Sequence, residues 1–234
     1  MQRRHFLAHV TGSLAVLAAM RQAHALTLAD LSQKDAGAGV KAALEKGALA
    51  AVSLLGRPDG FLGNPQVRIP LPAHLEKAAD FMRMAGQGQK VDELVTTMNR
   101  SAEAAVPMGK DLLVEAVKSM TVDDAKKILA GGDNAVTNFF ADKTRAPLGE
   151  KFQPVVTGAI RKVNLANAYN TFQRWGARLA MAGVVEEQPV SIETYVTGKT
   201  LDGLYALIGE EERKIRQDPV GTGNAILKKV FGAL

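Results

Sequence analysis

The spacing of the apolar residues constrains the fold of this chain more than any other feature of its sequence. Apolar side chains recur every three or four residues in most stretches, as at Val40, Leu44, Ala48 and Ala51, and this period marks one face of an α-helix. The two-residue alternation of half-buried strands is nearly absent. The sequence therefore predicts an all-α, single-domain multi-helix bundle over residues 26–234.

Glycine and proline residues mark the ends of the expected helices. These helices cover residues 28–55, 73–86, 91–106, 107–120, 121–130 and 133–140, two or three segments within 146–183, and residues 191–217 and 226–231. Thr121 is typical of an N-cap, because an acidic residue follows three positions later. Pro154 is expected to begin a helix, since proline suits the first turn. The glutamate run 210–212 is expected on a solvated outer face, paired with Lys214 and Arg216.

Residues 56–72 interrupt the helical pattern. They contain four of the nine prolines and three glycines, so no regular helix can run through them. A long Pro/Gly-rich loop is expected here, and long loops in compact domains are often functional. Its apolar side chains must pack inward or meet a partner, and both alternatives are open. The candidate interaction residues are Arg57, Asp59, Phe61, Leu62, Asn64 and Ile69.

A polar cluster borders the apolar face of the helix expected over residues 91–106. It consists of Asn99, Arg100 and Glu103, and the spacing allows Arg100 and Glu103 to pair at i+3. For these three side chains a structural polar network is favoured over a binding site.

The first 25 residues have the pattern of an export signal. Arg3 and Arg4 are followed by Phe6 and Leu7, which is the core of a twin-arginine signal. The apolar run over residues 10–20 is shorter than the ~20 residues of a membrane span, which argues against an uncleaved anchor. The small residues Ala23 and Ala25 complete a cleavage pattern. We expect cleavage after residue 25, export by the twin-arginine route, a periplasmic location, and no transmembrane span in the mature chain.

Loss of the signal would change the composition of the chain. The segment contains three arginines and no acidic residue, so its removal lowers the net charge from +5 to +2 and leaves His74 as the one histidine. A near-neutral chain without a clustered basic face is not expected to bind nucleic acid. One histidine and no cysteine argue against zinc sites, thiol catalysis and hydrolase triads. No catalytic residue, cofactor or metal site is expected.

These features favour a non-enzymatic binding or structural protein that acts through the loop and the neighbouring helix faces. One alternative is a carrier of an apolar ligand such as a lipid, in a cavity lined by Tyr169, Phe172 and Trp175. Another is a carboxylate-dependent enzyme acting on an envelope polymer, with Asp59 and Glu103 as candidate carboxylates. The expected partner is accordingly an unknown envelope protein or an apolar small molecule.

Several long sequence words resemble domain-of-unknown-function family 4197, a group of exported bacterial helical proteins. These words are LGRPDGFLGNPQVRIPLP, MNRSAEAAVP, MTVDDAKKIL, TNFF, YVTGKTLDGLYALIGEEERKIRQDP and LKKVFG. The resemblance covers residues 28–232 and implies an envelope protein with a helical fold, but no activity and no functional residues. Family members often carry a lipoprotein signal, and this chain departs from that pattern because it has no cysteine.

Overall fold

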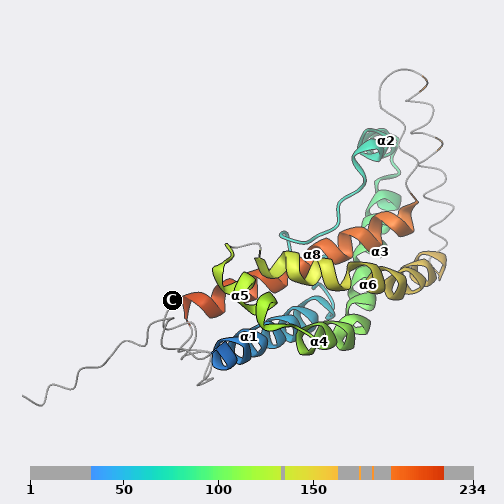
Figure 1. Cartoon of the computed structure of the whole chain (residues 1–234). Coiled ribbons are helices and arrows are strands. Elements are labelled where there is room, and N and C mark those ends of the chain that lie inside the picture. Colours follow the sequence, from blue (N-terminus) through green and yellow to red (C-terminus); the bar gives the residue numbers. More distant parts are fainter. Residues whose placement is uncertain (1–32, 133–134, 163–173, 175–180, 182–190, 219–234) are drawn as a thin grey trace, which may run out of the picture.

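The computed structural model describes residues 33–132, 135–162, 174, 181 and 191–218, and it confirms the all-α fold (Figure 1). No residue in these ranges lies in a β-strand. The elements are α1 (Gln33–Leu55), α2 (Ala73–Met84), α3 (Gly88–Ala105), the 3-10 helix η2 (Val106–Gly109), α4 (Lys110–Lys118), α5 (Val122–Ala130), α6 (Ala135–Lys162) and α8 (Ile192–Gln217). No helix in the described ranges combines the length and the hydrophobicity that a membrane span requires.

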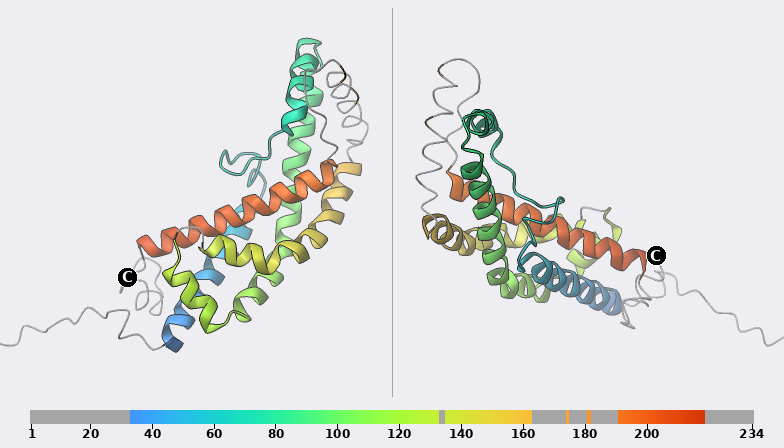
Figure 2. Two further views of the ribbon diagram at one scale, coloured as in Figure 1. Left: turned by 45° about the horizontal axis from the view of Figure 1, so that its top comes forward. Right: turned by 180° about the vertical axis from the view of Figure 1, so that it is seen from behind.

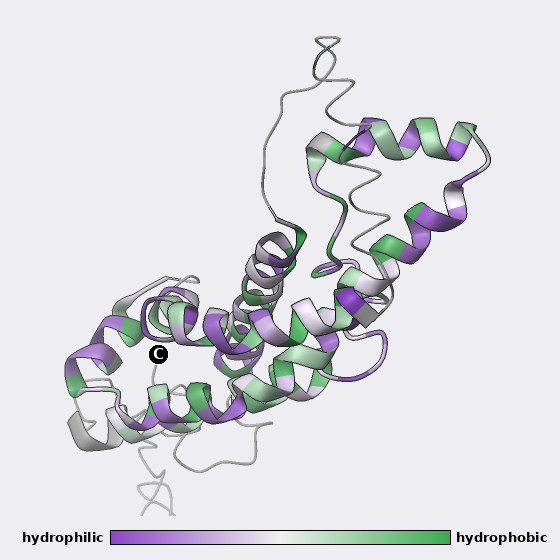
Figure 3. Cartoon of the chain, turned by 90° about the vertical axis from the view of Figure 1, so that its right-hand side faces the viewer, coloured by the Kyte–Doolittle hydropathy of each residue, from purple (hydrophilic) through white to green (hydrophobic). Residues whose placement is uncertain are grey.

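The long helices α1, α6 and α8 form the centre of the arrangement. Helix α8 packs on both α6 and α1, while α4 and α5 pack against α1 and α6. Helix α3 crosses α6 and contacts α8, and its N-terminal part projects from the bundle together with α2 (Figure 2). Hydrophobic and hydrophilic residues are interleaved along the described helices (Figure 3), as expected for amphipathic helices that each bury one face.

The helix ends agree with the glycine and capping signals where these are described. Helix α1 ends at Leu55, directly before Gly56, and α5 ends directly before Gly131. Thr121 accepts a hydrogen bond from the Asp124 amide, and the Asp124 carboxylate accepts one from the Thr121 amide, so the capping box is complete. Ser191 caps α8 by accepting a hydrogen bond from the Thr194 amide.

Helix α6 corrects the expectation that Pro154 begins a helix. The helix is continuous from Ala135 to Lys162, with Pro147 and Pro154 inside it. A proline removes one helical hydrogen bond, but Pro154 is exposed, so the carbonyl that loses its partner lies on the solvent side. On the opposite face a residue is buried at every fourth position, namely Val136, Phe140, Thr144, Leu148, Phe152, Val156 and Ile160. Burial of this stripe keeps the three segments that the two prolines separate in one helix.

Helix α8 corrects the expectation for the glutamate run. Lys214 pairs with Glu210 at 3.3 Å and with Glu211 at 2.7 Å on the surface. Glu212, however, is buried, with 3% of its surface exposed, and pairs with Arg216. Arg216 also donates a hydrogen bond to the Ile128 carbonyl oxygen at the end of α5, so this pair connects α8 to α5 instead of facing solvent.

Other expectations concern residues outside the described ranges. They are the export signal, the cavity lined by Tyr169, Phe172 and Trp175, and the last helix at 226–231. The structure therefore says nothing about these parts of the sequence.

Candidate functional site

The loop over residues 56–72 leaves α1 through a tight turn. The Gly56 amide donates to the Val52 carbonyl oxygen at 2.9 Å, a hydrogen bond of the helical i→i−4 type at the C-terminal end of α1. Asp59 then adopts φ of 65°, a conformation that asparagine and aspartate tolerate better than most residues. A Cβ atom at Gly60 would lie 2.5 Å from the Leu55 carbonyl oxygen, so only glycine fits where the loop folds back on α1.

The apolar side chains of the loop pack inward. Phe61 is 0% exposed and Ile69 is 1% exposed, and Val67 and Leu71 are also buried. Phe61 lies against α8 at Gly203, where a Cβ atom would be only 2.8 Å from the Phe61 ring. Of the two alternatives left open by the sequence, these side chains take the first: they seal the bundle and are not available to a partner. Leu62 is half-buried.

Asn99 of α3 fixes the second half of the loop. Its Oδ1 atom accepts a hydrogen bond from the Ile69 amide at 2.8 Å, and its Nδ2 atom donates to the Ile69 carbonyl oxygen at 2.9 Å. Nδ2 also donates to the Val95 carbonyl oxygen at 2.8 Å within α3. The buried amide therefore pairs with both backbone polar groups of one loop residue, as a neighbouring β-strand would.

Glu103 fixes the first half of the loop. Its Oε1 atom accepts hydrogen bonds from the Phe61 amide at 3.0 Å and the Leu62 amide at 3.1 Å. Its Oε2 atom accepts one from Arg100 at 2.7 Å, which is the i+3 pair that the spacing allows. Arg100 in turn donates to the Asp59 carboxylate at 2.8 Å. We call Asn99, Arg100 and Glu103 together the α3 clamp.

The charges of the clamp explain how a nearly buried carboxylate is tolerated. Glu103 is 5% exposed, and an unpaired buried charge would be strongly destabilising. The Arg100 side chain stays 41% exposed, so it neutralises Glu103 while remaining hydrated. The hydrogen bond to Glu103 raises the pKa of the Arg100 guanidinium above its usual range, and Asp59 acts in the same direction. Arg100 therefore stays charged at any physiological pH.

The outward side of the loop carries polar side chains. Arg57, Asp59, Gln66 and Arg68 are exposed, and we call these four residues the loop face. Among them Asp59 is paired with Arg100, whereas Arg57 and Arg68 form no ion pair with any described residue. The half-buried Asn64 shapes this face, because its Oδ1 atom accepts a hydrogen bond from the Gln66 amide at 3.1 Å, which is the geometry of an Asx turn.

A small cavity adjoins the loop face between the loop, α2 and α3. Its volume is about 250 Å³, and it is lined by Arg68, Pro70, Leu71, Glu76, Ala79, Arg83 and Val95. Tyr195 of α8 holds the loop beside it, because its hydroxyl group donates to the Pro70 carbonyl oxygen at 3.1 Å. The cavity is thus continuous with the loop face through Arg68.

The arrangement suits binding better than acid–base chemistry. Both oxygen atoms of Glu103 are engaged by groups of the chain itself, and the Asp59 carboxylate is paired with Arg100 at the surface. A general acid or base must instead reach a substrate proton. What the structure does bring together is a fixed loop, two arginines without an ion-pair partner in the described ranges, and an adjoining cavity.

Sequence reasoning selected the clamp and the loop as separate features and missed their contact. Nothing in the spacing shows that Glu103 would bind the amides of Phe61 and Leu62, which lie about forty positions earlier in the chain. It also missed Gln66 and Arg68, although charged and amide residues in a loop whose apolar neighbours are inward-facing are the natural candidates for its outer side.

The fold and the site define an all-α protein whose long loop is fixed by polar side chains of a single helix. The model of a family described as Protein of unknown function (DUF4197) matches residues 30–232. The chain belongs to this family, and the resemblance carried by its sequence words is confirmed. No curated protein and no solved structure matches the chain.

Proposed function

We propose that this chain is an exported periplasmic protein that acts without catalysis, by binding a partner through the loop face. The observation that carries the proposal is the α3 clamp. Asn99 and Glu103 of one helix form hydrogen bonds with the backbone of the loop, and Arg100 bonds to the Asp59 side chain, so the loop face is presented in one conformation. A preorganised surface loses less conformational entropy on binding than a mobile one.

The charge of the loop face favours an acidic partner. Arg57 and Arg68 are exposed and are not neutralised by any described acidic side chain, whereas Asp59 is neutralised by Arg100. Arginine presents a planar set of donors that matches carboxylate groups well. We infer that carboxylate groups of an envelope protein meet these two arginines, with the adjoining cavity receiving a small side chain of the partner.

Site-specific photocrosslinking tests this binding surface. A photoreactive amino acid is placed singly at Arg57, Gln66 or Arg68, and at Glu115 and Lys126 as controls, which are exposed on α4 and α5. We expect one crosslinked species of the same mass from the three loop-face positions and none from the controls. Reversing both arginine charges (Arg57→Glu, Arg68→Glu) should abolish the crosslink from Gln66. Equal crosslinking from the controls, no species at all, or no effect of charge reversal contradicts the proposal.

The export part of the proposal is supported by the arginine pair and the cleavage pattern of the first 25 residues. Its test is the replacement of Arg3 and Arg4 by lysine, followed by cell fractionation. We expect the variant to accumulate in the cytoplasm at its uncleaved mass, while the parent chain is found in the periplasm, shortened at its N-terminus. Unchanged export of the variant contradicts the twin-arginine route.

A further inference from the structure

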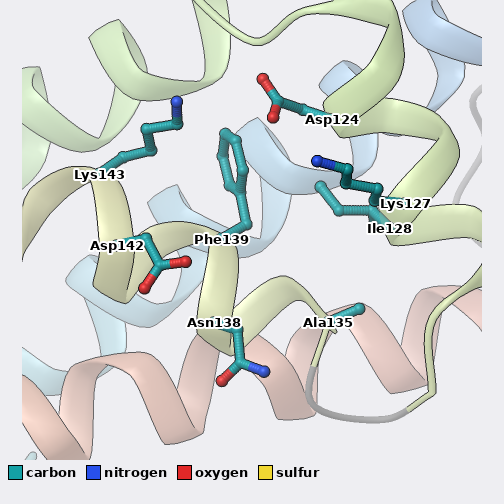
Figure 4. Close-up of a pocket in the computed structure, with 8 residues that line it drawn as sticks. All are labelled: Asp124, Lys127, Ile128, Ala135, Asn138, Phe139, Asp142 and Lys143. Carbon is teal, nitrogen blue, oxygen red and sulfur yellow. The ribbon is translucent and has the colours of Figure 1, made fainter.

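A second cavity lies between α5 and α6, on residues that the loop and the clamp do not use. Its volume is about 450 Å³, and it is lined by Asp124, Lys127, Ile128, Ala135, Asn138, Phe139, Asp142 and Lys143 (Figure 4). This volume lies within the range of small-molecule sites. Helical spacing explains the composition of the walls, because residues three or four positions apart share one face of a helix.

The floor of the cavity is apolar. Ile128 is 3% exposed and Phe139 is 8% exposed. The Phe139 ring packs edge-on against Phe140, with ring centroids 5.5 Å apart, which fixes its orientation. A fixed aromatic ring beside an aliphatic side chain provides a surface for an apolar group of a ligand.

The rim of the cavity carries two positive and two negative charges. Lys127 and Lys143 lie on opposite sides of the Phe139 ring, and Asp142 and Asn138 lie on another side of it (Figure 4). Neither lysine forms an ion pair with another described residue. Asp124 is already engaged, because its Oδ2 atom accepts hydrogen bonds from the Thr121 amide and hydroxyl groups.

The balance of charges decides which ligand fits. A simple anion would meet the two lysines but also the unpaired carboxylate of Asp142, and a simple cation would meet Asp142 but also the two lysines. A ligand with both charges satisfies both groups. Hydrogen bonds from Thr121 lower the pKa of Asp124, and the charges of Lys143 and Lys127 act in the same direction.

We propose that this cavity binds a free amino acid with an apolar side chain. Its carboxylate lies between Lys127 and Lys143, its ammonium group meets Asp142, and its side chain rests on Phe139. This site is separate from the loop face and goes beyond the proposed function, so either proposal can fail without the other.

Calorimetric titration of the purified full-length chain tests the charge requirement. The probes are L-phenylalanine, 3-phenylpropanoate, which lacks the ammonium group, and phenethylamine, which lacks the carboxylate. We expect L-phenylalanine to bind at least about tenfold more tightly than either of the others, since each of the others lacks one charge-assisted contact. The proposal is overturned if L-phenylalanine does not bind. It is also overturned if 3-phenylpropanoate or phenethylamine binds with the same affinity as L-phenylalanine.

Variants locate the binding. Lys127→Met, Lys143→Met and Asp142→Asn each should weaken L-phenylalanine binding at least about fivefold, and thermal unfolding should show that these exposed substitutions leave the fold intact. The matched controls are Lys126→Met and Asp123→Asn on α5. These two exposed residues form an ion pair, with 4.0 Å between Lys126 Nζ and Asp123 Oδ1, and do not line the cavity. Controls that weaken binding as much as the cavity variants, or cavity variants that bind as the parent does, overturn the proposal.

Discussion

Replacing Glu103 by alanine tests whether the α3 clamp holds the loop. The substitution removes the acceptor of the Phe61 and Leu62 amides and leaves Arg100 paired only with Asp59. A buried donor without a partner costs about 1–3 kcal/mol. The Phe61 amide is buried and takes the upper part of this range, while the Leu62 amide is partly buried and takes the lower part. Arg100 adds little, because it is exposed enough to be rehydrated. We expect the free energy of unfolding to fall by about 3–5 kcal/mol.

The glutamine variant separates the hydrogen bonds from the charge. Glu103→Gln keeps an oxygen acceptor for the two amides but turns an NH₂ group toward Arg100, so only the charge-assisted bond is lost. Such a bond contributes about 1.5–3 kcal/mol, and the exposure of Arg100 places the loss at the lower end of that range. Glu93→Ala, an exposed substitution on the same helix, is the control and should change stability by less than about 0.5 kcal/mol.

The measurement is urea unfolding followed by circular dichroism, with the slope of the transition compared between variants. The order of stability should be parent, then glutamine, then alanine, with similar slopes. If Glu103→Ala lowers stability no more than Glu93→Ala does, Glu103 does not hold the loop. Equal losses for alanine and glutamine would show that the two amide bonds contribute nothing beyond the ion pair.

Three further predictions concern the packing of the fold. Gly203→Ala should lower stability by about 1–3 kcal/mol, because the new Cβ atom would lie 2.8 Å from the Phe61 ring. The control is Gly198→Ala on the same helix, where a Cβ atom would have no atom within 4 Å, and it should raise stability by about 0.5–1 kcal/mol. Urea unfolding of both variants tests the contact. By the same assay Pro154→Ala should raise stability by about 1–3 kcal/mol, since proline is unfavourable inside a helix. A loss of stability in this variant would mean that Pro154 begins a helix. Hydrogen bonds from Thr121 lower the pKa of Asp124, so this carboxylate stabilises the fold above about pH 4 and the contribution disappears as the pH falls through the lowered value. The Asp124→Asn variant should therefore lose less stability than the parent between about pH 4 and pH 2, and a parallel profile would contradict the capping-box interpretation.

The helices were predictable because their signals are local. Gly56 and Gly131 follow the last residues of α1 and α5, and the capping box at Thr121 is set within four residues. Each of these signals acts through backbone groups within one turn. The sequence of α6 misled for the opposite reason. A proline is a strong local signal, but the buried stripe from Val136 to Ile160 acts over the whole helix, and burial of large apolar side chains outweighs one lost backbone bond.

The charged groups divide in the same way. Pairing of Arg100 with Glu103 follows from spacing along one helix. Burial of Glu103 and Glu212 does not follow, because it depends on what the rest of the chain places over them. Sequence gives glutamate a strong preference for the surface. Glu103 and Glu212 are exceptions, and each pairs with an arginine of its own helix. Each pair also connects to another segment: Glu103 accepts hydrogen bonds from the loop amides, and Arg216, the partner of Glu212, donates to the Ile128 carbonyl oxygen.

A buried carboxylate is a costly way to hold a loop if stability alone matters, since an apolar contact of similar size often stabilises as well. The difference lies in what is fixed. Apolar side chains such as Phe61 and Ile69 anchor the loop by burial, which tolerates small shifts, whereas the clamp accepts hydrogen bonds from particular amides of the loop and so fixes the path of the backbone. The path of the backbone in turn determines where the outward side chains Arg57 and Arg68 lie. A binding surface needs such a defined loop conformation and a merely sealed bundle does not, which is the physical reason to test the loop face for the partner that we propose.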